Sequence, residues 1–234
     1  MATTTTTAGK TTIINQLLGA IEAVTEPEAG LPVLEQFIYG VCREDASPEM
    51  AQQAFANLKT QFYDWNEVRV SGAREIEEAL EGLPDGERRS ERIISFLQEV
   101  FESTFSFDLE HVHKKGLKQG AGLLARFEAS SDHVGAWVVQ RSLGGHAVPV
   151  DTATMRVAVR LGLIDGGADV KTARAALEHL VPKTKGQAFT DAVSILAEQA
   201  CWEGEANCGG CPLRAGCPSA REAPESARGR SKPR

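Results

Sequence analysis

The sequence predicts an all-α protein. Apolar residues recur at the three- and four-residue spacing of a helix along most of the 234-residue chain, and no segment shows the strict alternation of a half-buried strand. The predicted helices are too short for a coiled coil. Hydrophobic residues make up 42% of the chain, which is enough for one domain with a core or for two small lobes that share one.

The predicted helices follow one another with short breaks. The first apolar stripe covers residues 13–24, and Pro27 and Gly30 then interrupt the chain. A second stripe covers residues 34–41. A third begins at Pro48, because proline is favoured in the first turn of a helix. The later stripes lie at residues 76–80, 93–101, 117–124, 134–141, 155–159, 173–177 and 189–200.

The two ends of the chain carry no such stripe. Residues 1–12 are rich in threonine and lack the apolar segment of a secretory signal, so we expect them to be disordered and the protein to be cytoplasmic. Residues 219–234 place five basic side chains among Ser, Pro, Gly and Ala, which predicts a disordered basic tail. Glu222 and Glu225 dilute its charge, which favours a solvated tail over a nucleic-acid-binding arm.

Charge and hydropathy narrow the range of partners. The net charge of −7 counts against strong nonspecific binding to nucleic acid, which requires Lys and Arg to replace the counterions of the phosphates. A local basic face is still compatible with that net charge. No apolar run approaches the ~18 residues of a membrane helix, so no membrane partner is expected.

Four cysteines near the C-terminus form the most specific pattern in the sequence. Cys201, Cys208, Cys211 and Cys217 are separated by six, two and five residues. Since cytoplasmic thiols stay reduced, such a cluster predicts one metal site rather than disulfides. The spacing alone fits either a structural zinc ion or a [4Fe-4S] cluster, although a typical zinc site has two Cys-x2-Cys pairs and this one has a single pair. The fifth cysteine, Cys42, lies on an apolar stripe and is predicted to be a core thiol.

This cysteine spacing resembles that of the endonuclease III family of helix-hairpin-helix DNA glycosylases, in which it holds a [4Fe-4S] cluster. The Cys-Pro-Leu sequence that begins at Cys211 is also typical of the family, and the V-P-V-D-T sequence of residues 148–152 is similar to its Val-Asp-Thr segment. The resemblance covers roughly residues 13–218. It implies a two-lobed helix-hairpin-helix glycosylase fold with a C-terminal iron-sulphur cluster loop, and double-stranded DNA as the partner of a monomer.

The resemblance also implies domain limits. Residues 31–146 would form a helical barrel lobe, and residues 13–27 together with 147–218 would form the lobe that carries the cluster. The ligands of that cluster would be the four C-terminal cysteines, Cys201, Cys208, Cys211 and Cys217.

Asp151 is the candidate catalytic residue. By residue type alone it is expected to cap the helix that begins at Thr152. In the family that the chain resembles, the aspartate at this position assists the departure of a flipped base. Cleavage of an N-glycosidic bond builds positive charge on the sugar, and a fixed carboxylate stabilises that charge or activates the attacking water. The base must first leave the stack and enter a pocket.

The expected hairpin departs from the family pattern. In the family it reads close to L-P-G-V-G, and its glycines let backbone N–H groups approach a phosphate. At that place this chain has F-E-A-S-S, residues 127–131. Ser130 and Ser131 remain candidates to cap the next helix and to contact DNA through their hydroxyl groups. Glu128 and Asp132 would repel a phosphate.

The position of the catalytic lysine is also changed. Bifunctional members carry a lysine two residues after the hairpin, where it forms a Schiff base with the sugar. Here that position falls on His133, whose imidazole forms no stable Schiff base, so a monofunctional glycosylase is predicted. His133 is a candidate contact to a phosphate or a water molecule, or else a partly exposed histidine in the first turn of a helix.

Two more segments have lost polar or basic residues. Arg43 stands in a segment that in the family enters the gap left by the flipped base, and it is a candidate DNA contact. Glu203 and Glu205 occupy a loop that is often basic in the family, which leaves Arg214 as a candidate phosphate contact. Two alternatives therefore stay open beside the glycosylase. One is a catalytically degenerate helix-hairpin-helix iron-sulphur protein that binds DNA or a protein partner, and the other is a zinc-stapled helical domain.

Overall fold

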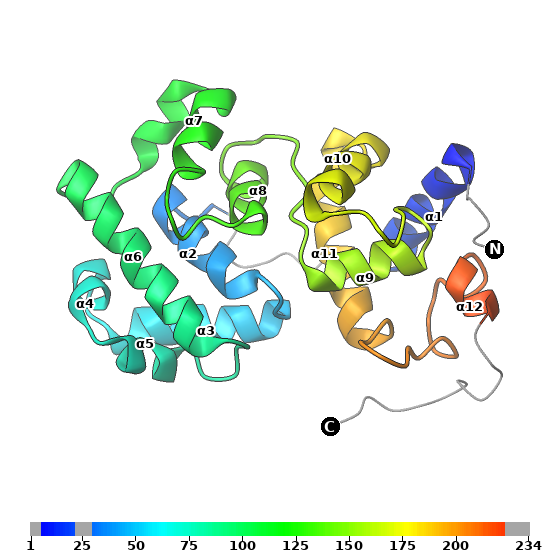
Figure 1. Ribbon diagram of the computed structural model, residues 1–234, viewed down its shortest axis with the longest axis horizontal. Helices are drawn as coiled ribbons and strands as arrows, with labels where there is room; N and C mark the ends of the chain where they lie inside the picture. Colours follow the sequence, from blue (N-terminus) through cyan, green and yellow to red (C-terminus); the bar gives the residue numbers. More distant parts are fainter. Residues whose placement is uncertain (1–5, 22–29, 223–234) are drawn as a thin grey trace. The chain divides into compact units, whose positions relative to one another are not determined.

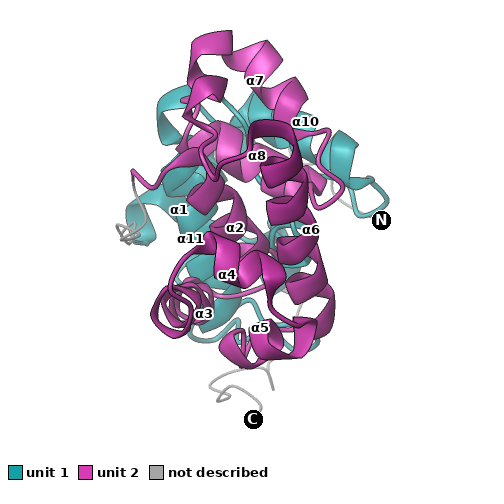
Figure 2. Cartoon of the chain, turned by 90° about the vertical axis from the view of Figure 1, so that its left-hand side faces the viewer, with its two compact units in different colours: residues 1–25, 146–234 teal, residues 26–145 magenta. Residues whose placement is uncertain are grey.

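The computed structural model describes residues 6–21 and 30–222 of the chain. Within these ranges every regular element is a helix and no strand forms, which confirms the predicted all-α class (Figure 1). None of the described helices is both long enough and apolar enough to cross a membrane. The chain divides into two compact units, coloured separately in Figure 2. Unit 1 contains residues 1–25 and 146–234, and unit 2 contains residues 26–145.

The helices keep the labels of Figure 1. Those of unit 2 are α2 (Val33–Arg43), α3 (Pro48–Gln61), α4 (Trp65–Val70), α5 (Ala73–Ala79), α6 (Gly86–Thr104), the 3₁₀ helix η1 (Glu110–Lys115), α7 (Leu117–Leu124) and α8 (Asp132–Arg141). Those of unit 1 are α1 (Thr7–Ala20), α9 (Thr152–Arg160), α10 (Val170–Leu180), the 3₁₀ helix η2 (Lys183–Lys185), α11 (Gly186–Gln199) and α12 (Pro218–Glu222). The chain passes from unit 2 to unit 1 between residues 145 and 146, whereas the predicted lobe boundary lies between residues 146 and 147.

Helix α2 forms the centre of unit 2, because all but one of its eleven side chains are buried. Its neighbours are α3, α6 and α8. Phe37 on α2 stacks against Phe96 on α6, with ring centroids 3.8 Å apart. Gly40 allows α8 to approach closely, since a Cβ at this position would lie 3.1 Å from a ring atom of Trp137. The core of unit 2 therefore fixes α8, which is the helix that follows the expected hairpin.

Unit 1 has a core of its own, built from both ends of the chain. Leu17 on α1, Val157 on α9 and Phe189 on α11 are fully buried in it. Helix α11 packs against α9 and α1, and α1 also contacts α10. The N-terminal helix therefore supports the C-terminal part of the chain that carries the cysteines.

The prediction of disorder for residues 1–12 was wrong where the structure describes them. Helix α1 begins at Thr7, and the side chain of Thr6 caps it by accepting a backbone N–H of its first turn. Lys10 donates a hydrogen bond to the carbonyl oxygen of Leu163, 2.9 Å away, which ties this turn to unit 1. Threonine-rich composition suggested disorder, but burial of Ile13 and Ile14, one turn after Lys10, stabilises a helix that begins earlier than the periodicity indicated.

Two other differences concern short elements. Helix α12 reaches residue 222 and so includes the first four residues of the predicted tail, while residues 1–5 and 223–234 lie outside the described residues. The sequence periodicity also missed α4, η1 and η2. These elements have three to six residues, which is too short for an apolar stripe to repeat.

Candidate active site and metal centre

Asp151 is the N-cap of α9, as its residue type predicted. Val148 and Val150, just before it, are buried in the core of unit 1 and fix the path of the backbone. The Asp151 carboxylate accepts a hydrogen bond from the backbone N–H of Thr154 through Oδ1, at 2.7 Å. The residue is half-buried, and this hydrogen bond holds its carboxylate in place. Such a fixed carboxylate can stabilise developing positive charge or activate a water molecule.

The four C-terminal cysteines all lie in unit 1, in the loop between α11 and α12. Cys201 and Cys217 are buried, Cys208 and Cys211 are half-buried, and all four are free thiols. The loop is closed by backbone hydrogen bonds such as that from the N–H of Asn207 to the carbonyl oxygen of Ala200, at 2.8 Å. The loop therefore has a defined path between its first and last cysteine.

The thiols influence one another's ionisation. Burial raises the pKa of the Cys211 thiol, and the neighbouring sulfurs of Cys217, Cys201 and Cys208 raise it further, against a backbone hydrogen bond at Leu213 that lowers it. Burial likewise raises the pKa of Cys217, with smaller contributions from Cys201 and Cys208. A cation bound by these thiolates would relieve their mutual repulsion.

Two arginines on one face of α9 hold this loop. Arg160 donates hydrogen bonds to the carbonyl oxygens of Trp202 and Gly204 and lies 3.5 Å from the Cys201 sulfur. Arg156, one turn earlier, donates to the carbonyl oxygen of Cys201 at 3.0 Å. These side chains pin the first third of the loop to α9, the helix that Asp151 caps.

The donor chemistry of this loop fits an iron-sulphur cluster or zinc, since both take four thiolate ligands. Among the described residues, however, no three His, Cys, Asp or Glu side chains are arranged as ready ligands of a metal ion. The type and the spacing of the four donors are therefore the features of this loop that match a metal centre.

A helical hairpin is present at the expected place. Helices α7 and α8 contact each other and are joined by a turn at residues 125–131. Ser131 caps α8, because its hydroxyl oxygen accepts the N–H of Val134 at 3.1 Å. Ser130 is half-buried in the same turn. The capping role expected of this serine pair is therefore confirmed for Ser131.

Acidic and basic side chains of α6 form hydrogen bonds with the backbone of this turn. Glu99 on α6 accepts the backbone N–H of Glu128 at 3.1 Å. Arg92, two turns earlier on the same face of α6, donates two hydrogen bonds to the carbonyl oxygen of Ala129. The hairpin is thus braced by α6, and its exposed charged side chains include the acidic Glu128 and Asp132 and the basic Arg126.

Known structures share this arrangement of helices. No family model matches the chain. Endonuclease III in a trapped covalent complex with DNA aligns over 93% of this chain and 98% of its own, with a TM-score of 0.74 and 15% identity. A thermostable thymine-DNA glycosylase aligns over 92% of this chain and 98% of its own, with a TM-score of 0.68 and 14% identity. The chain has the fold of the endonuclease III-like helix-hairpin-helix DNA glycosylases.

One curated protein is similar in sequence. DEMETER-like protein 3 of Arabidopsis thaliana is 30% identical over 122 residues, which is 52% of this chain. The chain spans only 11% of the length of that relative. The similarity is consistent with the helix-hairpin-helix fold and concerns a small part of the larger protein.

Within this glycosylase fold, Glu44 links α2 to the hairpin. It forms an ion pair with Arg92 at 2.8 Å, and its carboxylate also accepts a hydrogen bond from Ser131. Burial acts to raise the pKa of Glu44, but His133 and Arg92 outweigh burial and hold it below its usual value. A pocket of about 480 Å³ opens beside this network and is lined by both acidic and basic side chains.

His133 and Arg43 are not exposed, which disfavours the DNA contacts predicted for them. His133 lies in the first turn of α8 as expected, but it is 4% exposed and stacks against Trp137. Arg43 is 2% exposed; its guanidinium bonds the carbonyl oxygen of Ala46 and lies 5.2 Å from the Trp137 ring. Arg214 is exposed, so its phosphate contact stays a prediction.

The sequence missed the groups that support the site. Three side chains connect segments that lie far apart in the sequence: Arg160 bonds Trp202, Arg92 bonds Ala129, and Glu44 pairs with Arg92. No local sequence pattern reveals such contacts. For Arg160 the sequence does contain an indication. Arg156 and Arg160 are four residues apart, so both lie on one face of a helix.

Proposed function

We propose that this protein is a DNA glycosylase of the endonuclease III type, which hydrolyses the N-glycosidic bond of a damaged or mispaired base in double-stranded DNA and acts as a monomer. The observation that carries the proposal is the fixed, half-buried carboxylate of Asp151 at the start of α9, in a chain with this fold.

Asp151 would act on the sugar of the flipped nucleotide. As the bond between C1′ and the base nitrogen breaks, its electron pair leaves with the base and positive charge develops on the sugar. The Asp151 carboxylate stabilises that charge and accepts a proton from the water molecule that attacks C1′. The hydrogen bond from Thr154 keeps the carboxylate oriented during these steps.

The proposed enzyme has no Schiff-base lyase step. Formation of a Schiff base requires a primary amine near the sugar, and the position of the lysine is taken by His133. The burial of His133 against Trp137 supports this proposal, because the side chain is committed to the core of unit 2. The expected product is an intact strand with an abasic site.

We also propose that Cys201, Cys208, Cys211 and Cys217 hold a [4Fe-4S] cluster. When bound, such a cluster would staple the loop between α11 and α12. The protein's own contribution is made by Arg160, which holds the loop backbone on α9 and places a positive charge beside the Cys201 sulfur.

A second function, DNA or protein binding without catalysis, is favoured by the hairpin. Glu128 and Asp132 are exposed there, and Glu99 already occupies a backbone N–H of the turn. Unit 2 as a whole has 21 acidic and 12 basic residues. Each acidic group at a phosphate site weakens DNA binding by repulsion.

Base release from defined duplexes distinguishes the two functions. Anaerobically purified protein would be tested on duplexes with oxidised pyrimidines, uracil or A:8-oxoguanine mismatches, beside Asp151→Asn. Strand breaks that require alkali and are absent with Asp151→Asn would establish the monofunctional glycosylase. Failure to release any base, with an intact cluster by visible absorbance, would leave the degenerate binding protein.

A further inference from the structure

A second pocket of unit 2 is lined mainly by aromatic and aliphatic side chains. It has a volume of about 250 Å³, and most of its wall comes from α3, α4 and the turn between them, which lie in front in Figure 2. Its aromatic residues are Phe62, Tyr63 and Trp65, and Leu58 and Val68 complete its apolar part. Sites for drug-sized ligands measure about 300–1,000 Å³, so this pocket fits a single chemical group. We call it the Trp65 pocket.

Carboxylates give the Trp65 pocket its charge. Glu35 on α2 has a side chain that is only 15% exposed. Its Oε1 accepts the indole Nε1–H of Trp65 at 3.3 Å, and its Oε2 accepts a hydrogen bond from Lys59 at 2.8 Å. These bonds hold the carboxylate at the edge of the Trp65 ring. Asp64 also lines the pocket, which therefore has two acidic side chains and one basic side chain.

Lys59 shows that this environment accommodates a cation. Its ammonium group pairs with Glu35 and lies 5.6 Å from the centroid of the Phe55 ring, within the range of a cation–π contact. The Lys59 side chain is 46% exposed, and an ion pair made by such a side chain contributes little stability. A cation that enters from solvent can therefore replace it.

The turn between α3 and α4 is held in a fixed path. Asp64 caps α4, because its Oδ1 accepts the backbone N–H of Glu67 at 2.8 Å. In return, the Glu67 carboxylate accepts the backbone N–H of Tyr63. The side chain of Tyr63 is 95% exposed, so its ring is open to a ligand while its backbone is anchored. The pocket is thus built on a rigid turn and has an aromatic ring available beside it.

We propose that the Trp65 pocket binds a quaternary ammonium group, of the kind found in choline and in trimethyllysine. Aromatic rings recognise such cations through their negative faces, and the carboxylates add to the attraction. A quaternary ammonium group has no N–H and needs no hydrogen-bond acceptor. This suits Glu35, because both of its oxygens already accept a hydrogen bond. A primary ammonium ion would have to compete for those oxygens, and an anion would be repelled by them.

The inference goes beyond the glycosylase proposal and does not depend on it. All residues that line the Trp65 pocket lie in unit 2, and none belongs to the hairpin, to Asp151 or to the cysteine loop. A failure to release any base from DNA would leave this inference unchanged, and a failure to bind a quaternary ammonium group would leave the glycosylase proposal unchanged.

The test uses the full chain and two ligands, choline and a short peptide that contains trimethyllysine. Titration calorimetry measures the affinity, and tryptophan fluorescence locates the site, since Trp137 and Trp202 are buried whereas Trp65 lines the pocket. We expect saturable binding, and about tenfold weaker binding of the neutral isosteres in which carbon replaces the charged nitrogen. Binding of either ligand at this pocket supports the proposal, and the tighter of the two identifies the source of the ammonium group.

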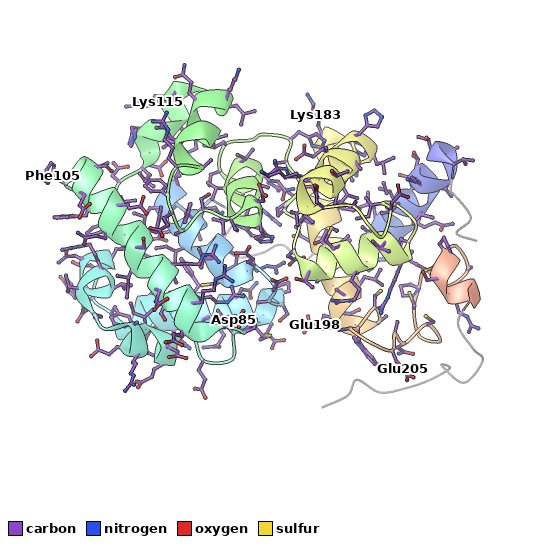
Figure 3. The ribbon with its side chains drawn as sticks, viewed as in Figure 1. Asp85, Phe105, Lys115, Lys183, Glu198 and Glu205 are labelled. Carbon is purple, nitrogen blue, oxygen red and sulfur yellow. The ribbon has the colours of Figure 1, made fainter. Side chains whose placement is uncertain are left out.

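Two substitutions should change the affinity in opposite directions. Trp65→Leu should weaken binding about tenfold, because the wall stays apolar but loses an aromatic face. Lys59→Met should strengthen binding several-fold, because it removes the competing cation and keeps the aliphatic stem. Phe105→Leu is the control for Trp65→Leu and should bind as the wild type does. Phe105 is 83% exposed, lies at the end of α6 (Figure 3) and is no part of the pocket.

Three outcomes would overturn the proposal. One is the absence of binding by either ligand, and another is equal binding of each cation and its neutral isostere, which would show a merely apolar pocket. The third is an unchanged affinity in Lys59→Met, a surface substitution that leaves the core of unit 2 intact even if Trp65→Leu should unfold.

Discussion

The carboxylate of Asp151 and the backbone N–H of Thr154 are joined by a hydrogen bond of 2.7 Å, so the candidate catalytic group is also the cap of its own helix. A cap and a catalytic carboxylate need different properties. Capping needs only an oxygen acceptor, which asparagine also offers, whereas stabilising a sugar cation needs negative charge. The two roles can therefore be separated by substitution.

Asp151→Asn should leave the fold intact and remove base excision. We expect the variant to unfold within a few tenths of a kcal/mol of the wild type, since Asn caps a helix as well as Asp. Its single-turnover rate of base release should fall by about 10²-fold or more, because the carboxylate's charge is lost. Asp151→Ala should lose the rate and, in addition, about 1 kcal/mol of unfolding free energy. Full activity in Asp151→Asn would refute the catalytic role.

Arg160→Met should loosen the cysteine loop. The variant loses the hydrogen bonds to the carbonyl oxygens of Trp202 and Gly204 and the contact with the Cys201 sulfur. Loss of such supporting contacts typically weakens metal binding about 10- to 100-fold. We expect faster release of iron to a chelator, followed by the decay of visible absorbance.

A second measurement makes the Arg160 prediction independent of the metal. In metal-free protein, amide hydrogen exchange in residues 201–208 should be faster in Arg160→Met than in wild type, because the loop backbone has lost its anchors. Arg174→Met is a suitable control, since Arg174 lies on α10 and pairs with Glu178 of the same helix. Unchanged exchange in Arg160→Met would show that the loop is held by other contacts.

Glu44 should make the stability of the protein depend on pH in the acid range. Its pKa is held below the usual value because His133 and Arg92 together outweigh the opposing effect of burial. A carboxyl group with a depressed pKa stabilises the fold above its unfolded-state pKa, and this contribution is lost as the pH falls through the folded-state pKa. The loss should therefore begin below about pH 4.3, the ordinary value for Glu.

Urea unfolding between pH 7 and pH 3 measures this effect. At pH 7, Glu44→Gln should lower the unfolding free energy by about 1 kcal/mol through the weakened pairing with Arg92. The difference between variant and wild type should shrink as the pH falls. Glu49→Gln, which changes an exposed residue on α3, serves as the control. A constant difference across the range would assign the effect of Glu44→Gln to packing.

The sequence was sufficient where the deciding physics is local. Helical periodicity located the long helices, and residue type placed the caps Ser131 and Asp151. The spacing of the cysteines brought them into one loop. The surface positions expected for Arg43 and His133 were wrong because tertiary packing decides them. Both side chains pack against Trp137 and are buried. The cation–π contact between Arg43 on α2 and Trp137 on α8 accommodates a charged group in a way that a single sequence does not encode.

The same reasoning applies to the acidic side chains of the hairpin. Glu128 and Asp132 were expected to repel phosphate on charge alone, and both are exposed. The role of Glu99 could not be predicted from the sequence, because Glu99 lies 29 residues before Glu128, the hairpin residue whose N–H it accepts. A sequence read locally shows which groups a turn has lost, whereas the structure shows which groups have taken their place.

Cys42 should be chemically inert in the folded protein. Burial raises its pKa to about 12, and the positive charge of Arg89 offsets burial only in part. Since the thiolate is the reactive form, a negligible fraction is reactive at pH 8. Iodoacetamide should therefore fail to label Cys42 in native protein, as read by mass spectrometry of its peptide, and should label it fully in denaturant. In metal-free protein the half-buried Cys208 provides the internal comparison and should react first. Labelling of native Cys42 at the rate of Cys208 would mean that α2 opens readily, and would contradict its place at the centre of unit 2.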